Sequence, residues 1–185
     1  MSKIKGFTLI ELMVTVAVIS ILATIAVPSL TSFINQNRVN SSRDVLISTI
    51  NMARSEAVNR NKNVVMCGLN AASNGCSGSL SFNNGVLVFV DKNSNQVYNS
   101  ADDTLLKKVS SNEFYGVPNI SYQDNRNIQA LVINSEGMMH IKKDGNVNLI
   151  ENEAIMSFCK NESKAALILK MIGNPLIKKK VADCV

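Results

Sequence analysis

The sequence predicts an α+β protein in which a long amino-terminal helix packs on an antiparallel β-sheet or sandwich head. Two observations predict this fold. Apolar residues fill an amino-terminal stretch and then continue at helical spacing, whereas after Asn61 they come in short runs separated by Gly, Asn and Ser. The 185 residues leave room for one ordinary domain and one long extra element, because domains most often contain about 100 to 150 residues.

The amino-terminal stretch is long enough to cross a membrane. Leu12 to Asn37 contains no charged residue, and a helix from Phe7 to Val27 would be about 31 Å long, which matches a hydrocarbon core of roughly 30 Å. Lys3 and Lys5 precede it, and the positive-inside rule keeps such a leader cytoplasmic. We therefore expect a single-pass helix with the head exported to the periplasm.

This stretch differs both from an ordinary secretory signal and from a plain membrane anchor, and Glu11 is the residue that argues against the anchor. A signal would end in a small-residue cleavage site and a polar mature start, and the apolar run shows neither. A carboxylate costs about 2.5 to 3.5 kcal/mol at the centre of a membrane, so it marks a function and a partner. Cleavage between Gly6 and Phe7 would create that partner, because the new amine lies one helical turn from Glu11.

The segment from Gly6 to Leu12, G-F-T-L-I-E-L, resembles the processing motif of type IV pilins and of type II secretion pseudopilins. The resemblance implies a type IV pilin-like fold in which a prepilin peptidase removes the leader, residues 1–6, and methylates the amine of Phe7. It also implies that Glu11 pairs with a neighbouring subunit's amine during assembly. Pro28 fits the same pattern, and it predicts a kink because proline cannot donate a backbone hydrogen bond.

The helix is expected to continue to residue 60, with residues 7–30 as the transmembrane and assembly half and residues 31–60 as an amphipathic half. Its apolar stripe recurs at intervals of about 3.6 residues, which is typical of a helix face that packs on a core. The stripe consists of Val39, Leu46, Ile50, Ala53 and Ala57.

Residues 61–185 are expected to form a meander-like β-rich head. Asp144-Gly145 is a strong hairpin signal between two of its runs. The predicted strands are Val64–Cys67, Val86–Val90, Thr104–Val109, Ala130–Asn134, Met138–Lys142, Asn146–Ile150, Ala154–Cys159, Ala165–Ile172 and Leu176–Val181.

The four cysteines contain no C-x-x-C pair of the kind that binds zinc or carries out redox chemistry. An exported head favours disulfides. Three pairings are open, and the simplest joins Cys67 to Cys76 and Cys159 to Cys184, because the two loops do not cross. In the chain-entropy model these bonds would contribute about 2.7 and about 3.5 kcal/mol.

The segment from Phe89 to Lys107 resembles a polar strand-to-strand connection of the FimU, FimT and GspH branch of the pilin family. This resemblance implies a minor pilin that helps to prime and cap a type IV pilus, and on which twitching motility, adhesion and DNA uptake depend. Its partners would be other minor pilins, the major pilin and the prepilin peptidase. The subunit would sit in the inner membrane first and in the extracellular pilus later. The alternatives are a DNA-binding minor pilin for natural transformation and a GspH-like minor pseudopilin of type II secretion.

Two segments resemble binding sites, and each also has a simpler interpretation. Asp91, Asn93, Asn95 and Asp102 have the 1, 3, 5, 12 spacing of a calcium loop, but Gln96 stands where the turn needs glycine, so a solvated loop and no metal are expected.

Lys178, Lys179 and Lys180 form a basic carboxyl-terminal run. It is able to hold DNA through its phosphates or to protect an edge strand. DNA-binding FimT-like members carry a Gly-Arg-x-Arg motif, but here the nearest equivalent is Gly173-Asn174-Pro175-Leu176, which lacks both arginines.

Catalysis is not expected. His140 is the single histidine in the chain and lies within a predicted strand, and no glycine elbow or phosphate loop accompanies it. The sequence thus predicts a structural subunit with no catalytic residue and no cofactor.

Overall fold

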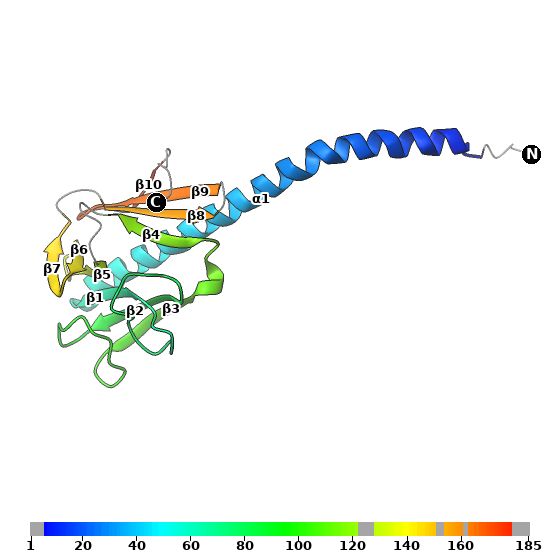
Figure 1. The fold of residues 1–185 in the computed structure, drawn as a ribbon. Helices are drawn as coiled ribbons and strands as arrows, with labels where there is room; N and C mark the ends of the chain where they lie inside the picture. The colour runs from blue at the N-terminus through cyan, green and yellow to red at the C-terminus, as the bar shows by residue number, and fades with distance from the viewer. Residues whose placement is uncertain (1–5, 122–127, 151–153, 161–162, 179–185) are drawn as a thin grey trace, which may run out of the picture. The chain divides into compact units, whose positions relative to one another are not determined.

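The computed structural model describes residues 6–121, 128–150, 154–160 and 163–178 (Figure 1). One long helix, α1 (Leu9–Arg60), precedes all the strands and a short 3₁₀ turn, η1 (Ser111–Glu113). The strands are β1 (Asn63–Gly68), β2 (Gly85–Asp91), β3 (Thr104–Ser110), β4 (Val117–Ser121), β5 (Ile128–Ile133), β6 (Met139–Lys143), β7 (Asn146–Leu149), β8 (Ala154–Lys160), β9 (Ser163–Leu169) and β10 (Leu176–Lys178).

The chain divides into two compact units between Asn35 and Gln36, and α1 runs through this boundary. In the first unit the large apolar side chains of the helix are exposed, from Phe7 to Ile34. This helix is long and apolar enough to cross a membrane, with a mean hydropathy of 2.4 in its most apolar window. Within the described part of the first unit no other element covers the apolar side chains of this helix. Its apolar surface is therefore available to lipid or to other helices.

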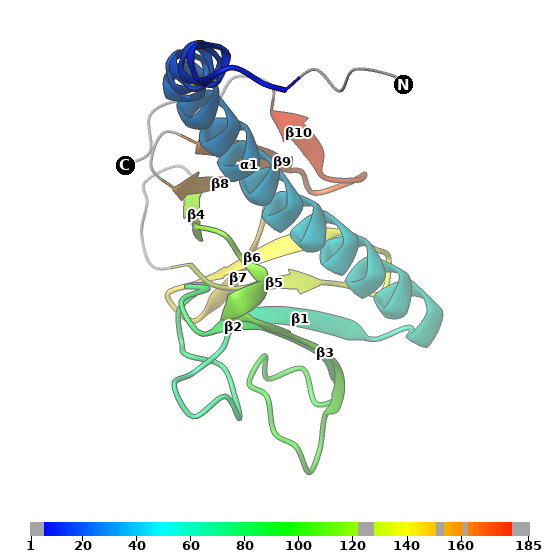
Figure 2. The same cartoon turned by 90° about the vertical axis from the view of Figure 1, so that its right-hand side faces the viewer.

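The second unit is built on residues 36–60 of α1. The predicted stripe is confirmed, because Val39, Leu46, Ile50, Ala53 and Ala57 are completely buried. They form one core cluster with apolar residues of both sheets. Figure 2 shows this part of the helix crossing the strands. Helical spacing of apolar residues thus creates the face on which the head is assembled.

The strands form two antiparallel sheets. The larger has six strands in the order β3-β2-β1-β5-β6-β7, and the smaller has four in the order β10-β9-β8-β4. β1 pairs with β2 on one side and with β5 on the other. The α+β fold with a helix packed on antiparallel sheets is as predicted.

The head is not a simple meander, which corrects one expectation. β4 was not predicted, and it pairs with β8 in the smaller sheet while β3 and β5, its neighbours in sequence, belong to the larger one. Its sequence contains Pro118, which weakens a strand signal but is tolerated on an edge strand, where a missing N–H costs no pairing. β9 ends at Leu169, earlier than the predicted Ile172.

The central strands of the larger sheet, β1, β2 and β5, are buried on both faces. Val64 and Met66 of β1 join the core around α1, whereas Val65 and Cys67 join a second cluster on the outer face. The ring of Tyr98 meets Phe89 of this cluster edge-on, with 5.2 Å between ring centroids. Connecting segments therefore cover the outer face of the sheet.

The predicted disulfide between Cys67 and Cys76 is confirmed. Its Cα atoms lie 5.6 Å apart, and the bond closes a loop with a sequence separation of 9. Because Cys67 belongs to β1 and Cys76 packs on the outer cluster, the bond ties this loop to the sheet.

Candidate assembly site at the amino terminus

Glu11 caps the helix to which it belongs. α1 begins at Leu9, and the Glu11 carboxylate accepts hydrogen bonds from the Thr8 backbone N–H and the Thr8 hydroxyl, each at 3.2 Å. The Glu11 N–H in turn donates to the Thr8 hydroxyl oxygen at 3.3 Å. This reciprocal arrangement is a capping box, which satisfies donors that have no partner at a helix start. The T-L-I-E spacing was a readable signal for it that the sequence analysis missed.

The cap places a carboxylate beside the position where processing would create an amine. Phe7 is 72% exposed and directly precedes the capping residue Thr8. Glu11 is exposed as well, so it is able to reach an amine outside its own chain. The positive end of the helix dipole adds to the stabilisation of the carboxylate there.

Hydroxyl groups within the apolar run bond to the backbone of their own helix. Thr15 donates to the Leu12 carbonyl at 2.8 Å, and Thr31 donates to the Pro28 carbonyl at 2.8 Å. Ser20 and Thr24 make equivalent bonds. An unpaired hydroxyl is costly in lipid, so these bonds make the run compatible with a membrane. The helix continues through Pro28, and the kink expected there stays a prediction.

The loop after β2 shows how the residues of the predicted calcium motif are used. Asp91 is buried, and its carboxylate accepts the N–H groups of Asn95 and Gln96 at 3.2 and 2.9 Å. The Asn95 side-chain oxygen accepts the Val97 N–H. In the described part of the chain, no group of three or more His, Cys, Asp or Glu residues is able to hold a metal ion. The side-chain oxygens of this loop thus accept hydrogen bonds from its backbone N–H groups.

Asp103 closes the same loop from its other end, a role that the sequence analysis missed. One of its oxygens accepts the Lys92 N–H at 3.2 Å, and the other accepts the Asn99 N–H at 2.9 Å. Its neighbour Asp102 is exposed and accepts a bond from the Asn99 side chain. The two buried carboxylates, Asp91 and Asp103, therefore hold the backbone of this loop at both ends.

Asp91→Ala is expected to lower the free energy of unfolding by about 2 to 4 kcal/mol, because two N–H groups lose a charged acceptor. Denaturant unfolding measures this loss, and hydrogen exchange should show faster exchange at Asn95 and Gln96. Asp102→Ala is the matched control, with an expected change below about 0.5 kcal/mol. A loss of the same size in both variants would contradict the assignment.

Part of the carboxyl-terminal predictions lies outside the described residues. Cys159 is disulfide-bonded, and its predicted partner Cys184 is outside the described part of the chain, as are Lys179 and Lys180. Lys178 ends β10 on the edge of the smaller sheet. DNA binding by this lysine run stays a prediction.

His140 lies on β6, as its position in a predicted strand implied. Burial lowers the pKa of its imidazole, with the Glu136 carboxylate acting in the opposite direction. Among the described residues its Nε2 has no hydrogen-bond partner. The structure thus places no nucleophile in hydrogen-bond contact with this atom within the described ranges.

The first helical turns of the second unit carry polar contacts that the sequence analysis missed. The Tyr115 N–H donates to the hydroxyl of the buried Ser42 at 2.6 Å. The Gln36 side-chain amide donates to the Lys164 carbonyl at 2.9 Å and accepts the Lys164 N–H at 3.3 Å. These bonds attach the η1–β4 connection and the start of β9 to α1. Single polar residues such as these form no periodic pattern in the sequence, so their contacts could not be predicted from it.

Comparisons with known proteins agree with this architecture. The prokaryotic N-terminal methylation motif matches residues 1–27, and the family described as type II transport protein GspH matches residues 43–172. The chain is similar in fold to the crystal structure of the type IV minor pilin FimU from Pseudomonas aeruginosa, at 14% identity and a TM-score of 0.50, over 79% of this chain and 92% of that one. No curated protein matches the sequence.

Proposed function

This chain belongs to the family of type II transport protein GspH, and on that premise we propose that it is a minor pilin, a structural subunit that helps to prime and cap a type IV pilus. The single observation that carries the proposal is the exposed apolar helix of the first unit, whose start is capped by Glu11. An apolar surface of this size must be covered by lipid or by other helices.

In this function the helix is first an anchor and then a filament core. The leader, residues 1–6, is removed in the inner membrane, with the head in the periplasm. The processed helix then packs against helices of the major pilin and of other minor pilins in a staggered, heterologous contact that repeats without closing. The head remains on the filament surface, with no catalytic role. The methylation motif at residues 1–27 supports the processing step.

Mass spectrometry of the native protein tests the processing step. The purified chain is expected to lack residues 1–6 and to carry one methyl group on the amine of Phe7. Gly6→Val should leave the leader attached, because the branched side chain blocks the cleavage site, whereas Gly75→Val in the head, at a glycine without a positive φ, should be processed normally. A native protein that retains Met1 to Gly6 would refute the proposal.

Type II secretion is the second candidate, because the chain's family is that of type II transport protein GspH. A GspH-like pseudopilin would use the same helix and the same Glu11 in a shorter pseudopilus. Deletion of the gene separates the two systems. Loss of twitching with normal export of enzymes is expected for the minor pilin, and the reverse phenotype would assign the chain to secretion.

A further inference from the structure

A cavity of about 340 Å³ opens in the head between three segments that are far apart in the sequence. Phe82 and Asn83 line it from the turn before β2. Ser111 and Phe114 line it from η1 and its carboxyl end, and Lys160 lines it from the end of β8. All these residues belong to the second compact unit. Small-ligand pockets range from about 300 to 1,000 Å³, so this cavity suits a small group.

Two aromatic rings form the apolar wall of the cavity. The ring centroids of Phe82 and Phe114 lie 6.1 Å apart, with an angle of 47° between the ring planes. Phe82 is buried in the core, and Phe114 packs against the same cluster. Because the core holds both rings, the wall is preformed, and an apolar group is able to cover it without a rearrangement of the head.

Lys160 provides a cation at the cavity. Its ammonium nitrogen lies 5.9 Å from the centroid of the Tyr115 ring, which attracts the charge and restricts its position. Neither of the ion pairs found in the described part of the chain includes Lys160. The Glu113 carboxylate of η1 accepts the Ser110 N–H at 3.0 Å and is not among the residues that line the cavity. The Lys160 ammonium is therefore available to an external anion.

Asn83 and Ser111 add neutral hydrogen-bonding groups. A side-chain amide offers donors and an acceptor, and a hydroxyl both donates and accepts. Within the described ranges neither side chain makes a hydrogen bond, whereas the neighbouring Asn84 side chain donates to the Leu69 carbonyl at 3.3 Å. The cavity thus combines an apolar wall, an amide that matches a peptide group, and one cation.

This combination selects one class of ligand. A carboxylate matches the Lys160 ammonium, a peptide group matches the Asn83 amide, and an apolar side chain matches the two rings. The last residue of a polypeptide carries all three groups within a short distance. A free phosphate would leave the rings uncovered, and a neutral apolar molecule would leave the ammonium without a counter-charge. Capture of a terminal carboxylate is a recurring mode of peptide recognition.

We propose that this cavity binds the free carboxyl-terminal residue of another polypeptide, one that ends in an aromatic or large apolar side chain. The terminal carboxylate accepts a charge-assisted hydrogen bond from Lys160. The Asn83 amide pairs with the last peptide group, and the terminal side chain packs on Phe82 and Phe114. This partner-binding role belongs to the head alone, so it goes beyond the proposed function and does not depend on filament assembly.

A nuclear magnetic resonance titration of the full-length, isotope-labelled protein in detergent micelles tests the proposal. The probe is N-acetylphenylalanine, which carries a ring, an amide and a free carboxylate. Three comparison probes each change one feature. N-acetylphenylalanine amide lacks the carboxylate, N-acetylalanine lacks the ring, and N-acetyl-aspartyl-phenylalanine amide has its carboxylate on an internal side chain. The backbone N–H signals of Asn83, Ser111 and Gly116 report binding, because these residues line the cavity.

N-acetylphenylalanine is expected to shift these signals with a Kd of about 1 mM or lower, an affinity within reach of a ligand of this size. Each comparison probe should bind at least about five-fold more weakly. Equal binding of the acid and its amide would overturn the proposal, because the rings alone would then explain it. Equal binding of the aspartyl probe would overturn the assignment to a chain terminus. The absence of any shift at about ten times the expected Kd would refute the site itself.

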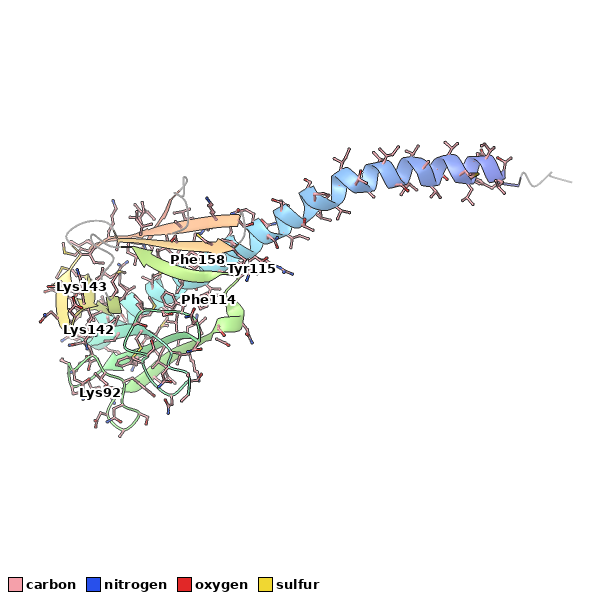
Figure 3. All side chains as sticks on the ribbon, viewed as in Figure 1. Lys92, Phe114, Tyr115, Lys142, Lys143 and Phe158 are labelled. Carbon is pink, nitrogen blue, oxygen red and sulfur yellow. A yellow bond between two sulfur atoms is a disulfide. The ribbon has the colours of Figure 1, made fainter. Side chains whose placement is uncertain are left out.

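Charge variants link the binding to Lys160. Lys160→Gln should weaken binding of N-acetylphenylalanine by about 5-fold to about 20-fold, and Lys160→Arg, which keeps the charge, by less than about three-fold. The loss is partial because the Arg38 guanidinium, 5.5 Å from the centroid of the same Tyr115 ring, remains in both variants. The matched control is Lys92→Gln, at an exposed lysine that Figure 3 places on the opposite side of the head from Tyr115. An equal loss in Lys160→Gln and Lys92→Gln would overturn the proposal, since binding would then follow net charge.

Discussion

Glu11→Gln is expected to reduce incorporation of this subunit into filaments at least about ten-fold, because the amine of a neighbouring Phe7 would lose its buried counter-charge. Glutamine keeps the length of the side chain and an oxygen that accepts the Thr8 N–H, so the helix cap survives in this variant. The measurement is the amount of subunit in sheared filaments relative to the amount in membranes.

Two further variants make this result specific. Glu11→Ala removes both the charge and the cap and should be at least as defective as Glu11→Gln. Glu136→Gln, at an exposed carboxylate in the head, should assemble normally. If Glu11→Gln filaments contain a normal amount of subunit, Glu11 serves only as a cap and its pairing with a neighbouring amine is wrong.

Gly68→Ala is expected to destabilise the head strongly although it adds a single methyl group. A Cβ at this position would lie 2.1 Å from the Ser81 carbonyl oxygen and 2.8 Å from the Ser79 carbonyl oxygen. Both are backbone atoms, which cannot rotate away, so the end of β1 or the loop that follows it must shift. We expect a loss of about 3 kcal/mol or more in the free energy of unfolding.

Gly75→Ala is the matched control for the crowding at Gly68. It lies in the same disulfide loop, and its added Cβ would meet the Asn70 side chain at an ordinary 3.5 Å. Denaturant unfolding of both variants with the disulfide intact should therefore separate them by more than about 2 kcal/mol. Equal stabilities would mean that the loop does not pack on β1 as closely as described.

The amino-terminal helix was predictable from sequence because the interactions that form it are local. Charge-free apolar length and helical periodicity act between residues that are close in the chain, so they predicted α1 and its buried stripe. The disulfide between Cys67 and Cys76 was predictable for the same reason, since a short loop favours its own closure.

The arrangement of the strands was less predictable because pairing joins distant residues. The sequence of β1 does not show that it lies between β2 and β5, and nothing local in β4 directs it to β8. In the loop after β2, alternating oxygen-bearing residues give the sequence the spacing of a calcium motif. The hydrogen-bond donors of those oxygens are determined by the folded loop. There the Asp91 carboxylate accepts the N–H groups of Asn95 and Gln96.

The completely buried stripe of α1 also determines where a soluble fragment can begin. A fragment that starts after Arg60 would lack Val39, Leu46 and Ile50. The apolar residues of both sheets that pack on these side chains would then be exposed to water. Residues 36–60 thus belong to the hydrophobic core of the head as well as to the helix. A stable shortened version should therefore begin at or before Gln36, where the second compact unit starts.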